Sequence, residues 1–309
     1  MRAAARLDRL TRLATSRARA LPDFLVIGAQ RAGSTSLFDY LCRHPQVASP
    51  SHKEIHFFDQ NFFRGEGWYR SHFPPRARLR RLSAVTGEAS PYYMFHPQAA
   101  RRAAAAVPEA RLIALLRNPV DRAYSHYQLA RRGGHERLGF REALEQESDR
   151  LAGEAEQIGA DPGYRSTPHR HLSYLARGLY AEQLERWLAV YPRDRMLVLR
   201  SEDLFAAPAT AYAETLAFLG LPEHELDAFP RRNWARYDEL DAATREWLVE
   251  YYREPNRRLY ELLGRDFGWE RLAAARPEPR AGAREVSRRE EAEADEQERV
   301  GRREADPHR

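Results

Sequence analysis

The sequence predicts an α/β fold in which helices flank both faces of a mainly parallel central sheet. Short apolar runs, typical of strands that are buried on both faces, alternate along the chain with segments of helical periodicity. The first of these runs, residues 24–27, leads into a turn bracketed by Gly28 and Gly33 and then into a helix. Alternation of this kind favours a parallel sheet, with the ligand site at the carboxyl ends of its strands.

The individual elements follow from apolar runs, prolines and glycines. Pro45 ends the first helix, Gly220 and Gly264 end the last two helices, and Asp241 is placed to cap the final helix. We expect strands at 24–27, 85–88, 111–116 and 196–200, and helices at 36–43, 97–107, 120–130, 178–191, 208–219 and 242–263.

Composition limits the class of protein. The 309 residues are enough for one large domain or two small ones, and Cys42 is the only cysteine, so we expect no intrachain disulfide and a cytoplasmic location. No stretch resembles a signal peptide or a membrane-spanning helix, which predicts a soluble protein. The net charge of +5 comes from 50 basic and 45 acidic residues. This balance suits an anionic ligand and argues against nucleic acid as a partner.

The two ends differ in composition from the middle. Residues 1–20 carry arginines and leucines at helical spacing, which permits either weak contact with an anionic membrane surface or a solvated helix. Residues 273–309 are rich in Arg, Glu, Ala and Asp and poor in large apolar side chains, which predicts a disordered or loosely helical tail. The functional domain is therefore expected at 21–272.

The turn after the first strand has the composition of a phosphate cradle. Its glycines have the outer spacing of a nucleotide-binding P-loop, but Ser34 stands where that motif requires lysine, which disfavours an ATPase or a kinase. Arg31 supplies a basic group inside the loop. The hydroxyls after Gly33 are expected to cap the helix, whose amino end favours an anion. The candidate ligand residues are Gln30, Arg31, Ala32, Gly33, Ser34, Thr35 and Ser36.

Two further motifs follow this loop in order: KEIHFFD at 53–59 and LLRNPVDRAYSHY at 115–127. With them the chain, from about residue 22 to 269, resembles the sulfotransferases that use 3′-phosphoadenosine 5′-phosphosulfate (PAPS), especially carbohydrate and heparan-sulfate sulfotransferases and their bacterial relatives. The resemblance implies a P-loop-like three-layer fold. It also implies sulfuryl transfer to a hydroxyl or amine of an acceptor, most often a saccharide, with adenosine 3′,5′-bisphosphate as product and no metal.

The resemblance also implies roles for individual residues. Glu54 would be the general base on the acceptor, and Arg31 would stabilise the leaving phosphate where family members commonly carry lysine. Arg117 and Ser125 would bind the 3′-phosphate. The aromatic pair after Glu54 is expected to desolvate its carboxylate and raise its pKa. The alternative is a surface glutamate paired with Lys53.

Other positions are assigned on weaker grounds. Tyr180, Arg232 and Arg236 resemble the late segment with which relatives cover the nucleotide. Lys53, His56 and Glu88 are candidates for the acceptor site, with ordering of the site as the alternative for Glu88. His52 and His56 have a zinc-compatible spacing on a helix, but no further ligands follow at a recognisable spacing, so we expect no metal.

Two other functions remain open at this point. The first is a P-loop kinase-like phosphotransferase, which the missing Walker lysine opposes. The second is a non-catalytic protein that binds a nucleotide in the same cradle. A binding test distinguishes these functions from a sulfotransferase. Adenosine 3′,5′-bisphosphate should stabilise the fold of a sulfotransferase far more than ATP does.

Overall fold

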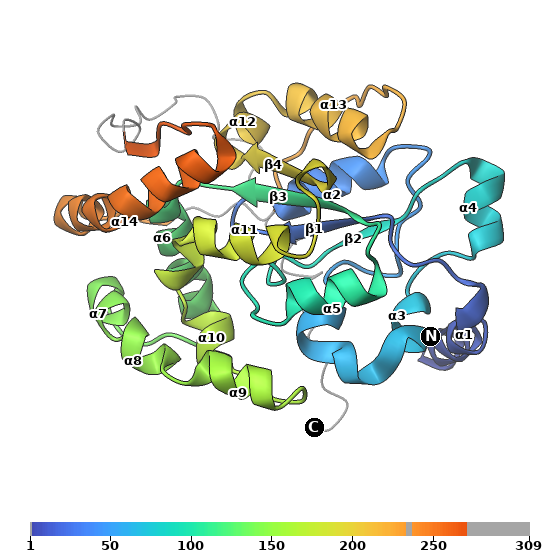
Figure 1. Cartoon of the computed structure of the whole chain (residues 1–309), viewed down its shortest axis with the longest axis horizontal. Helices are drawn as coiled ribbons and strands as arrows, with labels where there is room; N and C mark the ends of the chain where they lie inside the picture. Colours follow the sequence, from blue (N-terminus) through green and yellow to red (C-terminus); the bar gives the residue numbers. More distant parts are fainter. Residues whose placement is uncertain (1, 233–236, 271–309) are drawn as a thin grey trace.

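Four parallel strands form the centre of the molecule. The computed structural model describes residues 2–232 and 237–270. Its sheet has the order β2-β1-β3-β4, with β1 at Phe24–Gly28, β2 at Gly87–Ala89, β3 at Arg111–Leu116 and β4 at Met196–Arg200 (Figure 1). Every neighbouring pair of strands is parallel. The expected α/β fold with a parallel sheet is confirmed.

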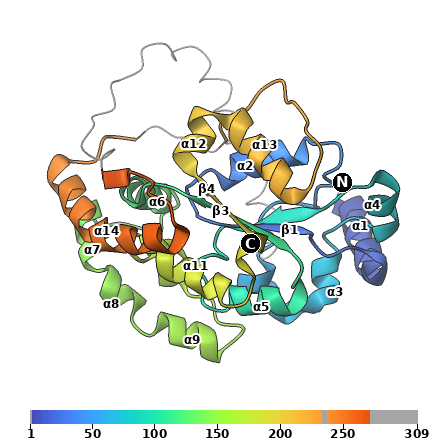
Figure 2. The ribbon, with the colours of Figure 1, turned by 45° about the horizontal axis from the view of Figure 1, so that its top comes forward.

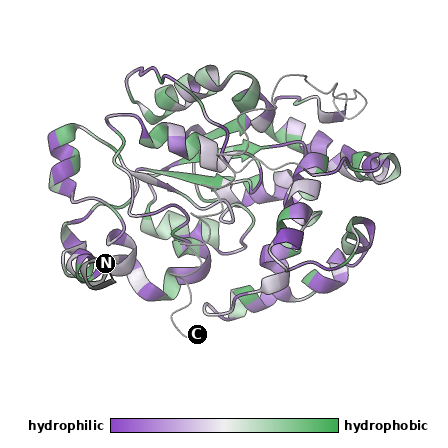
Figure 3. Cartoon of the chain, turned by 180° about the vertical axis from the view of Figure 1, so that it is seen from behind, coloured by the Kyte–Doolittle hydropathy of each residue, from purple (hydrophilic) through white to green (hydrophobic). Residues whose placement is uncertain are grey.

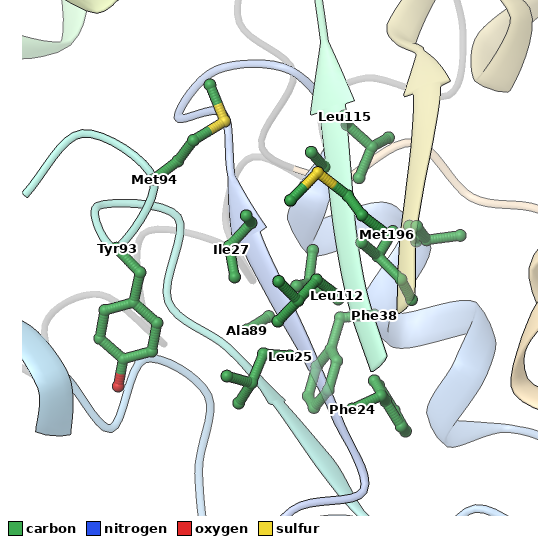
Figure 4. Close-up of a cluster of buried hydrophobic side chains, with 14 of the residues drawn as sticks. Phe24, Leu25, Ile27, Phe38, Ala89, Tyr93, Met94, Leu112, Leu115 and Met196 are labelled. Atoms are coloured by element: carbon green, nitrogen blue, oxygen red, sulfur yellow. The ribbon is translucent and has the colours of Figure 1, made fainter. Parts of the chain in front are cut away.

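The central strands are buried on both faces. The side chains of 24–27 in β1 and of 112–116 in β3 have no exposed surface. Helices α2 (Ser34–Cys42) and α13 (Pro208–Leu219) cover one face, and α5 (Ala99–Ala106) and α11 (Tyr180–Leu188) cover the other (Figures 1 and 2). Ile27, Leu112, Leu115 and Met196 pack together in the resulting core (Figure 4). Continuous apolar runs are stable only under such double cover.

Most expected elements are found, with small shifts at their ends. The strands at 111–116 and 196–200 and the helix at 208–219 have the predicted bounds, whereas β2 begins two residues late because Val85 forms an isolated bridge with Val47. The last helix, α14 (Ala242–Leu263), is capped by Asp241, whose carboxylate accepts a hydrogen bond of 2.8 Å from the Thr244 amide, and it stops at Gly264. Helix α6 (Pro119–Arg132) likewise includes the expected 120–130.

The remaining helices are short, apart from the amino-terminal one. They are α1 (Arg2–Ala14), α3 (Gly65–Arg70), α4 (Arg76–Leu82), α7 (Phe140–Glu145), α8 (Glu147–Leu151), α9 (Glu154–Ala160), α10 (Thr167–His171) and α12 (Ser201–Ala206). Figure 3 shows hydrophobic residues along the central strands and hydrophilic residues on the outer helices. None of the helices in the described ranges is long and apolar enough to cross a membrane. The predicted tail at 273–309 lies outside the described residues.

Candidate active site

The loop between β1 and α2 forms a tight turn at the carboxyl edge of the sheet. Arg31 and Gly33 adopt positive φ angles of 71° and 98°, a conformation that glycine tolerates best. A Cβ atom on Gly33 would lie 2.8 Å from Cζ of Phe205, so the close approach of α12 also requires glycine here.

The helix after this loop is not capped as expected. Gly33 is the N-cap and no side chain caps the helix, because the left-handed turn at Gly33 places the hydroxyl residues 34–36 inside the first turn. There, the Ser36 hydroxyl accepts a hydrogen bond of 2.9 Å from the Arg232 amide instead. The amides of a first helical turn have no carbonyl partner within their own helix, so this end still suits an anion.

Three of the predicted ligand residues meet beside this loop. Nε of Arg31 donates to the Ser125 hydroxyl at 2.9 Å, and Nη1 of Arg117 donates to the Arg31 carbonyl at 3.1 Å. Arg117 directly follows β3, and Ser125 is buried two turns into α6. The expected positions of Arg117 and Ser125 in their elements are thus confirmed. Their roles in binding the 3′-phosphate stay predictions. Arg31, which was assigned to the other end of the donor, is in direct contact with Ser125.

This cluster is rich in positive charge. Burial lowers the pKa of Arg31 to about 10; the nearby Tyr237 opposes this shift, and the charges of Arg117, Arg132 and Arg231 add to it. Among the residues described, none of these four arginines forms an ion pair with a carboxylate. Several guanidinium groups without a carboxylate partner fit a polyvalent anion such as a phosphate ester.

The second predicted centre is an array of charged side chains at 53–59. Nζ of Lys53 lies 2.5 Å from Oε1 of Glu54, and Nε2 of His56 lies 3.5 Å from Oε2 of the same carboxylate. Nδ1 of His56 lies 2.6 Å from Oδ2 of Asp59, which is buried. The lysine pair considered as an alternative is therefore present. It is accompanied by a histidine held between two carboxylates, and Asp59 was not predicted.

The charges in this array correct the expected pKa of Glu54. Burial alone would raise that pKa, but the charge of Lys53 and the hydrogen bond and charge of His56 outweigh it and hold the pKa well below its ordinary value. For His56, burial acts to lower the pKa, but Asp59 and Glu54 raise it to about 9. The expected desolvation of the carboxylate is present, but the charges of Lys53 and His56 outweigh it, so the predicted direction of the pKa shift was wrong. Phe57 stacks on Tyr69 with ring centroids 4.2 Å apart.

The backbone of this segment is held in a strained conformation. Glu54 and His56 both have positive φ angles, of 59° and 54°, which cost energy for residues with a side chain. The Glu54 amide donates to the Ala89 carbonyl at 3.1 Å. The His56 amide donates to the Ser90 hydroxyl at 3.2 Å. These bonds anchor the backbone of the segment to β2 and to the turn after it.

Glu88 supports this segment and does not face the acceptor site. Its carboxylate has no exposed surface and accepts hydrogen bonds from the hydroxyls of Tyr69, Ser90 and Tyr93 at 2.5–2.9 Å. The assignment of Glu88 to acceptor binding is therefore corrected to the alternative, ordering of the site. Burial raises the pKa of Glu88 to about 7, partly offset by those hydroxyl groups. Tyr93 in turn accepts a 2.7 Å hydrogen bond from the Phe57 amide.

A pocket of about 210 Å³ adjoins both centres. Gln30 of the cradle loop and Glu54 and His56 of the charged array contribute to its lining. Arg177, also in the lining, donates to the side-chain oxygen of Gln30 and lies over the ring of Tyr92 at 4.7 Å. Arg177 was not predicted. A larger cavity of about 430 Å³ is lined by residues that precede β1 and β3, at the opposite edge of the sheet from the one where parallel folds bind ligands.

The remaining predicted residues lie near the cradle or outside the described ranges. The buried hydroxyl of Tyr180 donates a hydrogen bond of 2.8 Å to the Arg117 carbonyl, so Tyr180 helps to hold the backbone of Arg117 in place. Arg232 contacts the cradle through its backbone amide. Arg236 lies outside the described residues. No group of three or more His, Cys, Asp or Glu residues within 2–232 and 237–270 is placed to hold a metal ion.

Fold and site together define a parallel α/β protein that presents arginines and an ionised carboxylate at the carboxyl edge of its sheet. Residues 21–254 match the sulfotransferase domain family, and the chain belongs to that family. It is a transferase that transfers sulfate. A solved structure supports the fold: a sulfotransferase from Alicyclobacillus acidocaldarius aligns with a TM-score of 0.61 and 33% identity over 82% of this chain and 99% of that one.

Curated relatives include several sulfotransferases. Membrane-associated sulfotransferase kil1 of Dictyostelium discoideum is 29% identical over 81% of this chain and 67% of its own length. Human heparan sulfate glucosamine 3-O-sulfotransferase 6 is 30% identical over 81% of this chain and 74% of its own length. Mouse bifunctional heparan sulfate N-deacetylase/N-sulfotransferase 4 is 33% identical over 79% of this chain, but the match spans only 30% of that relative.

Proposed function

We propose that this sulfotransferase uses PAPS as its donor and transfers the sulfuryl group to a hydroxyl or amine of a saccharide. The convergence of Arg31, Arg117 and Ser125 beside the cradle loop carries this proposal, because it gathers positive charge where a phosphate ester can be bound. The names of the heparan sulfate relatives support a saccharide acceptor. We do not extend the proposal to deacetylation, since the chain spans about 30% of the bifunctional relatives.

In the proposed reaction PAPS supplies the sulfuryl group. The side chains of this protein bind the donor, stabilise its developing charge and deprotonate the acceptor. Arg117 and Ser125 hold the 3′-phosphate. Arg31 and the amides at the start of α2 stabilise negative charge on the 5′ side, because fixed donors aimed at developing charge lower the barrier. Glu54 accepts the proton of the acceptor. Its low pKa keeps it ionised at neutral pH, but also makes it a weaker base than a carboxylate whose pKa lies near the operating pH, so its contribution rests on its position beside the acceptor.

The pocket lined by Gln30, Glu54 and His56 is the proposed acceptor site. It joins the cradle loop to the base, so an acceptor bound there would reach both. Transfer needs the nucleophile, the base and the donor in one place, and this shared lining supports that arrangement.

Ligand binding and product analysis test the proposal. Adenosine 3′,5′-bisphosphate should raise the unfolding temperature more than adenosine 5′-monophosphate or ATP at equal concentration. Incubation with labelled PAPS and a panel of saccharides should then label a hydroxyl-bearing or amine-bearing sugar. Equal stabilisation by ATP would favour a kinase-like protein. Strong binding of the bisphosphate with no transfer to any acceptor in the panel would favour the non-catalytic alternative.

A further inference from the structure

A strongly basic surface lies on the side of the molecule that carries α1 and α4. We define this basic face as residues 7–20 and 61–82, which contain ten arginines and only two acidic residues, Asp8 and Glu66. The whole chain has a net charge of +5. The positive charge of the protein is therefore concentrated on this face, and the rest of the chain is slightly acidic.

The two segments of the basic face pack as one unit. Nη2 of Arg76 donates to the Arg17 carbonyl at 2.7 Å, and Nη1 of Arg70 donates to the Arg19 carbonyl at 2.9 Å. Arg19 in turn donates to the Phe73 carbonyl at 2.8 Å. Figures 1 and 2 show α1, α3 and α4 close together on one side of the molecule. The segment directly after α1 is therefore fixed in its position relative to α3 and α4.

The acidic residues of this face neutralise only part of its charge. Asp8 pairs with Arg12 at 2.7 Å and Glu66 pairs with Arg70 at 2.5 Å. The four arginines of α4, at positions 76, 78, 80 and 81, are exposed, and none is in an ion pair with another described residue. Their charge is available to a partner.

The pKa of a neighbouring histidine supports this clustering of charge. Burial is the main cause that lowers the pKa of His72, which reaches about 3, and His52 adds to the shift. The charges of Arg9, Arg12 and Arg64 lower the pKa of His72 further. Because these arginines come from both segments of the face, the two segments place positive charge near the same histidine.

Exposed apolar side chains are interspersed among these arginines. Six large hydrophobic residues are exposed in the described part of the chain, and four lie on the basic face: Leu7 (66% exposed), Leu10 (55%), Phe63 (58%) and Leu82 (43%). Water contact with such side chains is unfavourable, and single exposed residues are ordinary, but four of the six belong to the two segments of the basic face.

We propose that the basic face docks on an anionic lipid bilayer. Arginines attract acidic headgroups within a Debye length of the surface, and leucine and phenylalanine side chains among them enter the headgroup region. A polyanionic chain such as a nucleic acid or a sulfated glycan would match the charge but would leave the apolar side chains in water. The strands in Figure 1 point away from α1 and α4, so docking leaves the carboxyl edge of the sheet accessible.

Sedimentation of the full chain with vesicles tests this proposal. The chain should bind vesicles of phosphatidylcholine with phosphatidylglycerol, bind phosphatidylcholine alone at least ~100-fold more weakly, and dissociate as salt is raised. The triple variant Arg78→Gln, Arg80→Gln, Arg81→Gln should lose ~100-fold in partitioning, because each cation near an anionic leaflet contributes about a five-fold gain. The double variant Leu7→Gln, Leu10→Gln should also lose most of its binding.

Matched controls separate docking from net charge and from folding. Arg141→Gln, Arg253→Gln, Arg257→Gln removes the same charge from exposed positions on α7 and α14 and should bind vesicles like the unchanged protein. Val190→Gln is the control for the leucines. All variants should keep the same response to adenosine 3′,5′-bisphosphate. The proposal is wrong if the two triple variants lose binding equally, or if the chain binds a soluble polyanion but no anionic vesicle.

Discussion

The guanidinium of Arg31 and the hydroxyl of Ser125 are joined by a 2.9 Å hydrogen bond, although 94 positions separate them in the sequence. This bond links the cradle loop to helix α6, so the residues assigned to the two ends of the donor nucleotide touch each other. One hydroxyl has two lone pairs and one proton. Ser125 can therefore donate its proton to a phosphate while it still accepts the hydrogen bond from Arg31, so the two residues can bind the donor as a linked pair. Predictions about either residue must allow for this coupling.

Replacement of Arg117 by alanine should weaken binding of adenosine 3′,5′-bisphosphate by ~10-fold to 100-fold, the scale of hydrogen bonds to a charged group. Adenosine 5′-monophosphate, which lacks the 3′-phosphate, should bind almost as before. Titration calorimetry with both ligands measures the difference. Because Arg117 also donates to the Arg31 carbonyl, equal losses for the two ligands would mean that it acts only by holding the loop.

Glu54→Gln should lower turnover by ~10²-fold or more and leave nucleotide binding nearly unchanged, because a positioned base contributes about that factor. Single-turnover rates and binding of adenosine 3′,5′-bisphosphate measure the two effects separately. Glu145→Gln is the matched control, since Glu145 is an exposed glutamate paired with Arg141 at 2.7 Å. An active Glu54→Gln enzyme would show that Glu54 is only the partner of Lys53.

His56→Gln should move the acidic limb of the pH profile of kcat/KM to higher pH by ~1 unit or more, since the imidazolium helps to keep the pKa of Glu54 low. The contribution of His56 to stability changes at high pH, whereas its effect on activity is at low pH. Raising the pKa of His56 to about 9 stabilises the folded state fully below pH ~6.5, and this contribution is lost as pH rises through 9. Unfolding of the unchanged protein should therefore become easier above pH 9, and less so in His56→Gln.

Asp59→Asn gives an independent check of the same array. It removes the charge that raises the pKa of His56, so the histidine should become neutral at lower pH. The acidic limb of kcat/KM should stay in place in this variant, because His56 is still protonated at the low pH at which Glu54 titrates. An acidic limb that also stays in place in His56→Gln would exclude His56 as a determinant of the pKa of Glu54.

The sheet was predictable because its strands are short apolar runs with both faces buried. Strand β3 has the predicted bounds, and the last helix begins after Asp241 and ends at Gly264 for the capping reasons given in advance. The short helices between 140 and 171 were not predicted. Segments of five to seven residues contain fewer than two turns, so their periodicity is too brief to read, and packing against the rest of the fold decides their conformation.

The site was predictable in its residues and less so in its electrostatics. The motif identifies Glu54, but the predicted direction of its pKa shift was wrong, because the charges of Lys53 and His56 outweigh the desolvation of the carboxylate. Both rings turn toward Tyr69, whereas Lys53 and His56 face the carboxylate. Asp59 reaches His56 only because the chain forms an irregular helical turn at Phe57–Asn61.

The place of Arg177 beside the cradle loop could not be predicted, because it depends on contacts between residues far apart in the sequence. It bonds to Gln30, 147 positions away, and its fully buried guanidinium is otherwise held by backbone carbonyls and the Ser173 hydroxyl. No motif marked it. A buried arginine beside a cradle loop can be recognised only once the fold brings the two segments together.

The last prediction concerns Arg31, whose two possible roles have different signatures. If Arg31 protonates the leaving oxygen, Arg31→Lys should raise turnover, since lysine donates a proton more readily. If Arg31 stabilises charge with its planar guanidinium, Arg31→Lys should lower turnover and Arg31→Ala should lower it further. We expect the second result, because the pKa of about 10 keeps Arg31 charged at neutral pH and its Nε is already fixed by Ser125.

The hydrogen bond between Arg31 and Ser125 sharpens this test. Arg31→Ala, Ser125→Ala and the double variant form a cycle in which both turnover and affinity for adenosine 3′,5′-bisphosphate are measured. If Arg31 acts on the leaving phosphate, its loss should reduce turnover at saturating PAPS by ~10²-fold or more, well beyond the loss in affinity. If Arg31 shares the 3′-phosphate with Ser125, affinity should fall most and turnover at saturating PAPS should fall little, and the double variant measures how far the hydrogen bond between the two residues couples their effects. Unchanged turnover and affinity in Arg31→Ala would exclude both roles.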